Sequence, residues 1–369
     1  MKRELERVEI PDEHEARARS WEVVRTAFEE REVARPTRSW RPLVVVVAAA
    51  AIVAAVVSPP GRSVVDSLRE AIGVEGAQPA LFSLPAEGQL LVSTDAGPWV
   101  VQPDGSRRLL GTYTEASWSP FANFVVAARA DELAALEPDG DVRWKLSRPA
   151  VRLPRWGGTR TDTRIAYLSG RTLRVVAGDG TGDAEVARDV ALVAPAWRPG
   201  AGHVVAYVAA DGRVRLVDVD RRRSVFRSQN RTRKPVALAW SHDGTSLASL
   251  GQGVLEVVLG DTRVTRLEGT GVAVAAKPGS ASFAVVERLR TGLSRVSMVD
   301  TGRELFSGAG TFDGLAWSPN GRWLLVAWHD ADQWVFVRAA QTPRIAAVSN
   351  VSAQFDGSFP HIEGWCCAD

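Results

Sequence analysis

Cysteine is nearly absent from this chain: only two of its 369 residues are cysteines, and they are adjacent, at Cys366 and Cys367. Such a pair cannot build a disulfide framework, and it lacks the spacing of a CxxC zinc site. Histidine is also sparse, with five residues, and the four beyond residue 60 show no i, i+2 or i, i+4 pairing. We therefore expect neither a metal site nor a bound cofactor.

A dominant charge of one sign is missing as well. Lys and Arg together number 45 and Asp and Glu 43, which leaves a net charge of +2. A charge this small on a chain of this length provides no overall field for gripping nucleic acid. Hydrophobic residues make up 45% and charged residues 24%, close to globular averages, so wholesale disorder and a polytopic membrane protein are excluded. We expect a protein with a real core and no nucleic-acid partner.

Catalytic motifs are weak. Gly244 to Ala248 approaches the pattern of a nucleophile elbow, but Ser246 opens a strand where that motif needs a strand-to-helix turn. Gly178 to Asp183 is rich in glycine and aspartate, yet no helix follows for phosphate binding and no glutamate completes a calcium loop. The sequence therefore predicts that the protein is not an enzyme.

Long hydrophobic runs are absent except for one, the 15 consecutive apolar residues Leu43–Val57. As a helix this run spans about 22 Å, so its flanks must complete a bilayer core of about 30 Å. Trp40 and Arg41 before it and a double proline after it favour a transmembrane helix over residues 42–58. A buried core helix and a cleaved signal peptide are the alternatives. A mixed-charge leader of 41 residues without an Ala-x-Ala site disfavours the signal peptide.

The charges beside this run predict its orientation. Four arginines precede it and two follow it in the matching stretch, and positive charge concentrates on the cytoplasmic side. We therefore expect a single-pass protein of the cell membrane with a cytoplasmic N-terminus and an exported C-terminal region. The four arginines are Arg31, Arg35, Arg38 and Arg41, and the two are Arg62 and Arg69.

The expected cytoplasmic tail, residues 1–41, contains a helix-like stretch over residues 12–32 with acidic residues in its first turn. Trp21, Val24 and Phe28 follow one another at helical spacing and share a face. We expect this face to dock a cytoplasmic partner, the alternative being a marginal helix that lies on the membrane surface.

Beyond residue 88 the chain carries a repeat. Residues 59–88 read as a spacer punctuated by glycine and proline, and short alternating strands separated by Asp-Gly turns follow, such as Val204–Val208, Val254–Leu259 and Trp323–Trp328. A motif of small residues around a tryptophan returns at intervals of 38, 41, 43, 37 and 40 residues. Its central residues are Trp118, Trp156, Trp197, Trp240, Lys277 and Trp317. A period near 40 with about four strands per unit is typical of propeller blades.

The motif resembles the WD40-like repeat of TolB-type propellers (PD40), whose consensus W-S-P-D-G-x-x-L-A is best matched at Trp240–Ala248 and Trp317–Val326. The resemblance covers residues 89–369. It implies an all-β propeller and no particular ligand. The extra α/β domain of TolB is replaced here by the predicted anchor. The whole layout resembles single-pass, membrane-anchored propeller proteins of actinobacteria.

The ends of the repeat region predict how the ring closes. Three strands precede the first tryptophan motif without a tryptophan-bearing strand ahead of them, and the motif recurs around Trp365 just before the chain ends. We expect the C-terminal strand to complete the N-terminal blade, which gives a seven-bladed β-propeller over residues 89–369 without exposed edges. The repeated tryptophans are expected to pack between blades.

Loops between the second and third strands of the blades share one face of a propeller, so we expect a recognition surface there, with ordinary loop polarity as the alternative at each position. Its candidate residues are Arg129, Asp131, Arg288, Arg290, His329, Asp330, Asp332, Gln333 and Trp334.

Two further features leave alternatives open. Arg221–Lys234 holds seven basic and no acidic residues in 14 positions; we favour solvent-exposed charge over an anionic lipid or cell-wall polymer partner. Cys366 and Cys367 end the closing strand, where neighbouring side chains point to opposite faces. Buried packing of at least one cysteine is therefore favoured over a vicinal disulfide, which needs a distorted turn.

These features predict a non-enzymatic, membrane-anchored, extracytoplasmic propeller that binds a protein or an envelope component, with signalling to the cytoplasmic helix as a further expectation. One alternative is an anti-sigma-like transmembrane regulator, although Ala18 and Trp21 stand where a zinc-type anti-sigma motif has cysteines. The other is a propeller hydrolase or lactonase of the cell envelope, which would need acidic and histidine residues converging on a central channel.

Overall fold

The computed structural model describes residues 83–367 except for residues 160, 201, 261 and 341–343. The predicted cytoplasmic tail, the transmembrane helix and nearly all of the spacer lie outside the described residues. Within the described part of the chain, no helix is both long and apolar enough to cross a membrane.

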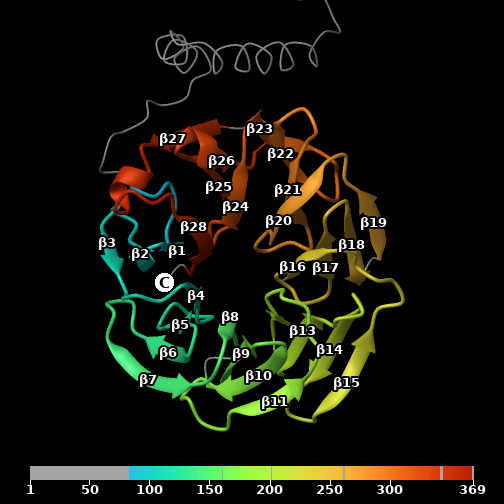
Figure 1. Cartoon of the computed structure of the whole chain (residues 1–369). Helices are drawn as coiled ribbons and strands as arrows, with labels where there is room; N and C mark the ends of the chain where they lie inside the picture. The colour runs from blue at the N-terminus through green and yellow to red at the C-terminus, as the bar shows by residue number, and fades with distance from the viewer. Residues whose placement is uncertain (1–82, 160, 201, 261, 341–343, 368–369) are drawn as a thin grey trace, which may run out of the picture. The chain divides into compact units, whose positions relative to one another are not determined.

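The described residues form seven antiparallel sheets of four strands each, arranged as blades in a ring (Figure 1). Blade 1 consists of β28 (His361–Cys366), β1 (Gln89–Thr94), β2 (Gly97–Val101) and β3 (Arg107–Leu109). Blade 2 consists of β4 (Glu115–Trp118), β5 (Val125–Arg129), β6 (Glu132–Leu136) and β7 (Val142–Ser147). Blade 3 consists of β8 (Val151–Gly158), β9 (Thr163–Ser169), β10 (Thr172–Ala177) and β11 (Ala184–Ala187). Blade 4 consists of β12 (Ala196–Trp197), β13 (Val204–Val208), β14 (Val214–Asp218) and β15 (Arg223–Arg227).

The remaining blades follow the same order from the innermost to the outermost strand. Blade 5 consists of β16 (Pro235–Trp240), β17 (Leu247–Gly251), β18 (Val254–Leu259) and β19 (Arg263–Arg266). Blade 6 consists of β20 (Thr270–Ala276), β21 (Phe283–Arg288), β22 (Leu293–Met298) and β23 (Glu304–Ala309). Blade 7 consists of β24 (Phe312–Trp317), β25 (Trp323–Trp328), β26 (Gln333–Arg338) and β27 (Arg344–Ser349). Two short 3-10 helices, η2 (His329–Ala331) and η3 (Ser352–Gln354), lie in loops.

The predicted ring closure is confirmed. The last strand, β28, pairs antiparallel with β1, so that Trp365 lies opposite Leu90, and it occupies the innermost position of blade 1. The chain therefore contributes strands from both ends of the described region to one blade, and the number of blades is seven as expected. The expected strands Val204–Val208, Val254–Leu259 and Trp323–Trp328 coincide with β13, β18 and β25.

The Asp-Gly turns explain how the strands reverse direction so tightly. Gly244 has a φ of +66°, in the left-handed region that glycine adopts without strain. A Cβ there would stand 2.6 Å from the carbonyl oxygen of Pro199. The preceding Asp243 accepts hydrogen bonds from Ser241 and from Thr245, and these bonds lower the pKa of its carboxyl to about 2.

The tryptophans of the repeated motif pack between blades, as expected. The indole Nε1 of Trp197 donates to the carbonyl of Arg155 at 2.9 Å, and that of Trp240 donates to the carbonyl of Ala196 at 3.1 Å; both acceptors lie on the innermost strand of the preceding blade. Close packing extends to Gly157, where a Cβ would stand 2.2 Å from the Trp197 ring. These rings therefore link the inner strands around the ring.

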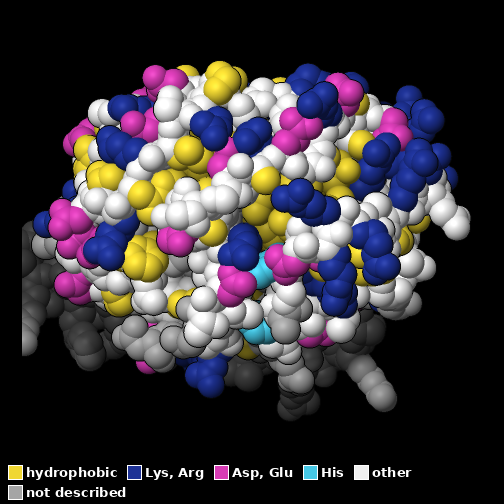
Figure 2. Space-filling view, turned by 90° about the horizontal axis from the view of Figure 1, so that it is seen from below, with side chains coloured by type: hydrophobic (Ala, Val, Ile, Leu, Met, Phe, Trp, Pro, Cys, Tyr) yellow, Lys and Arg dark blue, Asp and Glu magenta, His cyan; other side chains and the backbone are white. Residues whose placement is uncertain are grey.

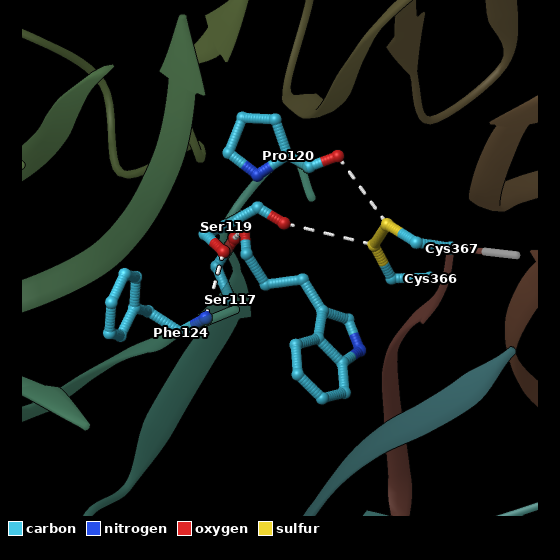
Figure 3. Close-up of a disulfide and its surroundings, with 7 residues drawn as sticks. Ser117, Ser119, Pro120, Phe124, Cys366 and Cys367 are labelled. Carbon is cyan, nitrogen blue, oxygen red and sulfur yellow. Dashed lines mark hydrogen bonds between the residues drawn. A yellow bond between two sulfur atoms is a disulfide. The ribbon is translucent and has the colours of Figure 1, made fainter. Parts of the chain in front are cut away.

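The closing strand ends in a disulfide between Cys366 and Cys367, the arrangement that the sequence disfavoured (Figure 3). Both residues are half-buried. Cys367 has a φ of +52°, in the left-handed region, and this conformation forms the distorted turn that a disulfide between adjacent cysteines needs. The Cys366 Sγ lies 3.7 Å from the carbonyl oxygen of Ser119, and the Cys367 Sγ lies 3.4 Å from that of Pro120. The end of β28 thus contacts the first turn of blade 2.

Candidate functional site

The predicted recognition surface comprises loops on one face of blades 2, 6 and 7. In blade 2, Arg129 forms ion pairs with Glu132 at 3.2 Å and Asp131 at 3.9 Å, and its guanidinium lies 5.9 Å from the ring of Tyr113. Glu132 also pairs with Lys145 at 3.2 Å. The charges of this loop are therefore largely satisfied within the blade.

In blade 6, Arg288 ends β21 and Arg290 lies in the following turn, and both are exposed. Blade 1 stands between blade 2 and blades 6 and 7 in the ring (Figure 1). No contact between the blade 2 candidates and those of blade 6 or 7 is recorded among the described residues. The structure thus places the candidates on one face without gathering them into one site.

The blade 7 candidates hold a neighbouring loop in place. Asp332 accepts hydrogen bonds from the backbone N–H of Ser352 at 2.8 Å and from its hydroxyl at 2.7 Å. Asp330 accepts one from the backbone N–H of Thr311 at 3.0 Å. The ring of His329 lies 5.0 Å from that of Phe359. Asp332 and His329 thus anchor the connection from β27 to β28, and Asp330 anchors the turn from β23 to β24.

Trp334 corrects the prediction for this loop. The sequence placed its ring at a recognition surface, beside Gln333, but its exposed fraction is 0%. It belongs to β26 and packs in a core cluster with Phe355, at a centroid distance of 5.4 Å. Four successive residues of β26, Trp334 to Val337, are buried, so both faces of this strand pack in the interior. Gln333 is half-buried.

A groove lies on the opposite face, between blades 2 and 3, and sequence reasoning missed it. It encloses about 540 Å³ and is lined by loops that join first to second strands and third to fourth strands. Because consecutive strands are antiparallel, these loops lie at the other end of the blades from the predicted surface. We call this site the aromatic groove; its principal lining residues are Phe124, Arg143, Trp144, Trp156, Asp162 and Arg164.

Three aromatic rings shape the aromatic groove. Phe124 and Trp156 stack with their centroids 5.9 Å apart and an interplanar angle of 15°. Trp144 is held by a hydrogen bond from its Nε1 to the carbonyl of Gly178 at 2.9 Å. Arg143 places its guanidinium 5.9 Å from the centroid of Phe124. The rings are therefore fixed in position before any ligand arrives, which lowers the entropic cost of binding.

The charged groups of the aromatic groove balance. Arg143 pairs with Glu137 at 3.1 Å, and Arg164 pairs with Asp162. Asp179 accepts hydrogen bonds from Thr181, which lower the pKa of its carboxyl. A site with fixed rings and a balanced polar rim suits a ligand with an apolar centre and hydrogen-bonding edges. Across the described residues, no cluster of three His, Cys, Asp or Glu side chains could hold a metal ion.

A buried ionic network joins the same two blades. The side chain of Asp183 is only 5% exposed. It accepts hydrogen bonds from Tyr167 at 2.7 Å, from Arg174 and from Arg148, which directly follows β7 of blade 2. Burial by itself would raise the pKa of Asp183, but the bonds from Arg174, Tyr167 and Arg148 outweigh it and lower the pKa. Burial, together with the bond to this carboxylate, raises the pKa of Tyr167. The bond between Asp183 and Arg148 thus ties blade 3 to the end of blade 2 beside the groove.

Comparisons with known proteins bear on the fold alone. No family model matches the chain, and no curated protein matches it. Among the solved structures that match, one titled "Crystal Structure of Mitotic Checkpoint Complex" shares 15% sequence identity, with a TM-score of 0.48 over 62% of this chain and 78% of that chain. The strand order and the ring closure define this chain as a seven-bladed β-propeller.

Proposed function

We propose that the chain is a non-enzymatic binding module that holds a segment of a partner protein in the aromatic groove. A propeller is a rigid scaffold suited to protein binding, and closure of the ring by β28 keeps its loops in fixed relative positions. The observation that carries the proposal is the groove between blades 2 and 3, with its stacked Phe124 and Trp156.

The chemistry of the aromatic groove favours a peptide that inserts an aromatic or proline side chain. Arg143 and Asp162 at its rim are partly exposed. Arg143 can donate hydrogen bonds to the carbonyl groups of a peptide backbone, and Asp162 can accept them from its N–H groups. Its volume of about 540 Å³ admits one large side chain with its neighbours. Fixed aromatic side chains in desolvated sites commonly provide most of the binding energy at protein interfaces.

We further propose that this module belongs to the TolB-type propellers and is anchored in the cell membrane by residues 42–58. The apolar run Leu43–Val57 and the arginines before it support a single span with the propeller outside the cytoplasm. The motifs at Trp240 and Trp317 support the TolB type, in an arrangement resembling that of actinobacterial proteins.

In this arrangement the helical stretch 12–32 is placed to meet a cytoplasmic protein through Trp21, Val24 and Phe28, and occupancy of the propeller would be signalled to it. Recovery of a sigma factor by residues 1–41 in a pull-down would support the anti-sigma alternative. An envelope component other than protein, and a hydrolase or lactonase activity, stay alternative predictions.

A peptide selection tests the proposed function. The full-length protein in detergent micelles is panned against random peptides displayed on phage, and the enriched peptides are titrated by fluorescence anisotropy. We expect the enriched peptides to share an aromatic or proline residue. Phe124→Ala should weaken their binding about tenfold or more, because it removes one stacked ring of the groove.

Trp323→Ala is the matched control. Trp323 stands six residues after Trp317, as Phe124 stands six residues after Trp118, so it occupies the equivalent position on blade 7. Its backbone N–H donates to Ser318 as that of Phe124 donates to Ser119. Binding should survive this change. Peptides that bind the Phe124→Ala variant as tightly as the original protein, or an absence of enrichment, would refute the groove as the binding site.

A further inference from the structure

Basic residues concentrate in blade 4. Residues 211–234 contain nine Lys or Arg and three Asp, a net charge of +6, whereas the whole chain carries +2. The rest of the chain is therefore net negative. The positive segment runs from the turn before β14, through the outermost strand β15, to the loop that leads to blade 5.

The three aspartates of this segment already contact basic side chains. Asp211 pairs with Arg215 at 3.4 Å and Arg227 at 3.3 Å, and Asp218 pairs with Arg221 at 2.7 Å. The third, Asp220, contacts His203. Five exposed basic residues form no ion pair with any residue in the described part of the chain, and we call them the basic rim. They are Arg222, Arg223, Arg231, Arg233 and Lys234.

The corresponding positions of the preceding blades differ. On β7, Arg143 pairs with Glu137 at 3.1 Å and Lys145 pairs with Glu132 at 3.2 Å. After β11, Arg188 pairs with Glu185 at 2.6 Å. The basic residues at these edges of blades 2 and 3 are thus neutralised within their own blades. Figure 2, which views the outer rim from below Figure 1, shows Lys and Arg side chains gathered at the right, towards β15.

Exposed apolar residues and a firm loop accompany the basic rim. Val225 on β15 is 43% exposed, and Val264 on the neighbouring outer strand β19 is 59% exposed. The loop after β15 is fixed to blade 5 by a hydrogen bond from Asn230 to Glu256 at 2.7 Å and by a 2.7 Å bond between Thr232 and Ser249. The cations therefore lie at the start of the outer strand β15 and along the loop that leads from it to β16, next to short exposed apolar side chains.

We propose that the basic rim docks the propeller edge against an anionic membrane surface, with Arg222, Arg223, Arg231, Arg233 and Lys234 contacting lipid phosphates. The cations flank both ends of β15 and do not converge on a pocket, so they match a flat array of phosphates better than one bound anion. Val225 and Val264 can enter the headgroup layer between them. This inference rests on the proposed membrane placement and not on peptide binding by the aromatic groove.

The proposed anchor does not dictate which edge meets the membrane. Residues 58–82, between the apolar run and the first described residue, number 25. Fully extended, a chain of this length reaches at most about 85 Å. A connection of this length does not select one edge of the propeller. Contact of blade 4 with the membrane therefore requires an attraction at that edge, and the positive charge of the basic rim supplies it.

Hydrogen exchange in nanodiscs tests the docking. The full-length protein is reconstituted in discs of phosphatidylcholine alone and in discs that also contain phosphatidylglycerol. The outward backbone N–H groups of β15 are unpaired at the sheet edge and exchange readily. We expect exchange across residues 221–234 to slow about fivefold or more in the anionic discs only, and added salt should abolish the difference.

Two variants define the cause. Replacing Arg222, Arg223, Arg231 and Arg233 by Gln should remove the slowing, whereas replacing the same four by Lys should keep it, because the charge is retained. Arg107→Gln with Arg108→Gln, on exposed positions of the outer strand β3, is the matched control and should keep the slowing.

The opposite results would overturn the proposal. Equal exchange in both kinds of disc would show that the edge does not meet anionic lipid. Slowing by soluble polyphosphate without slowing by phosphatidylglycerol would assign the basic rim to a free phosphate polymer and would equally refute membrane docking. Peptide binding by the aromatic groove is measured separately, so its loss or survival leaves these outcomes distinct.

Discussion

The innermost and outermost strands of this propeller differ in what their side chains do. Six of the seven inner strands carry a tryptophan that packs against the preceding blade, as Trp240 does with Ala196, and blade 6 carries Lys277 at that position. Outer strands vary from blade to blade, from the ion-paired β7 to the basic β15. The inner strands have to satisfy the same packing geometry seven times, whereas the outer strands face solvent and are free to differ.

The comparison separates stability from recognition. Changes on inner strands or between blades should cost stability, because they leave cavities or unpaired buried charges. Changes confined to the outer edge should leave stability nearly unaltered, whereas the aromatic groove draws on both kinds of strand, with Trp156 from the inner strand β8 and Trp144 from the outer strand β7. Five experiments follow, beginning with the largest expected effect.

Removing the closing strand should have the largest effect on stability. Deletion of residues 361–369 removes the buried side chains of Ile362 and Trp365 and leaves β1 with an unpaired edge. We expect the melting temperature, followed by circular dichroism, to fall by about 10 °C or more. His361→Ala, at an exposed position of the same strand, is the control. An unaltered melt of the deletion variant would contradict the ring closure.

Removing the buried charge between blades 2 and 3 should have the next largest effect. Asp183→Asn takes the anion away from Arg148, Arg174 and Tyr167 and should destabilise the propeller by about 3 kcal/mol, because the arginines are left without their partner. Asp179→Asn, at an exposed turn residue nearby, should cost much less. Similar melting temperatures for the two variants would show that the network does not hold the blades together.

The Asp183 network also predicts a pH dependence. Because the folded-state pKa of Asp183 lies below its ordinary value, the network contributes fully at pH values above about 3.9 and loses its contribution as the pH falls through the lower folded value. The difference in melting temperature between the original protein and Asp183→Asn should therefore be constant near neutral pH and shrink in strong acid. A difference that grows on acidification would contradict this assignment.

Neutralising the basic rim should affect stability far less. The four exposed arginines at positions 222, 223, 231 and 233 form no ion pair with a described residue, so their replacement by Gln should shift the unfolding free energy by less than about 1 kcal/mol in total. Chemical denaturation measures this. A loss as large as that of Asp183→Asn would mean that the outer edge of blade 4 is structural.

Reducing the disulfide should have the smallest effect. A bond between Cys366 and Cys367 encloses no intervening residue, so it removes almost no chain entropy from the unfolded state. We expect thiol labelling to detect both cysteines only after reduction and the melting temperature to change by no more than about 1 °C. Free thiols before reduction would contradict the bond. A large fall in the melt would show that it latches the ring.

The parts of this fold that the sequence predicts are those set by local repetition. Six of the seven blades carry a tryptophan at the same inner position and blade 6 carries Lys277 there, so the spacing of Trp118, Trp156 and their successors reports the blade count. Trp334 escaped prediction because its position next to a loop suggested exposure, whereas β26 lies between neighbouring blades and is buried on both faces.

The aromatic groove could not be predicted because it is formed by two blades at once. Phe124, Trp144 and Trp156 meet only when blades 2 and 3 are set side by side. The sequence does carry a weak signal, since the residue six places after Trp118 is aromatic, but Trp323 on blade 7 shares that property. The packing of the neighbouring blade decides whether Phe124 or Trp323 lines a groove.

Site-specific photo-cross-linking in cells tests the central claim, that this propeller binds a partner protein in the aromatic groove. A photoreactive residue is placed at position 123, in the groove, or at position 322, the equivalent and similarly exposed position of blade 7. We predict a discrete cross-linked protein from position 123 that Phe124→Ala abolishes, and none from position 322. The same product from both positions, or a product that survives Phe124→Ala, would contradict the account.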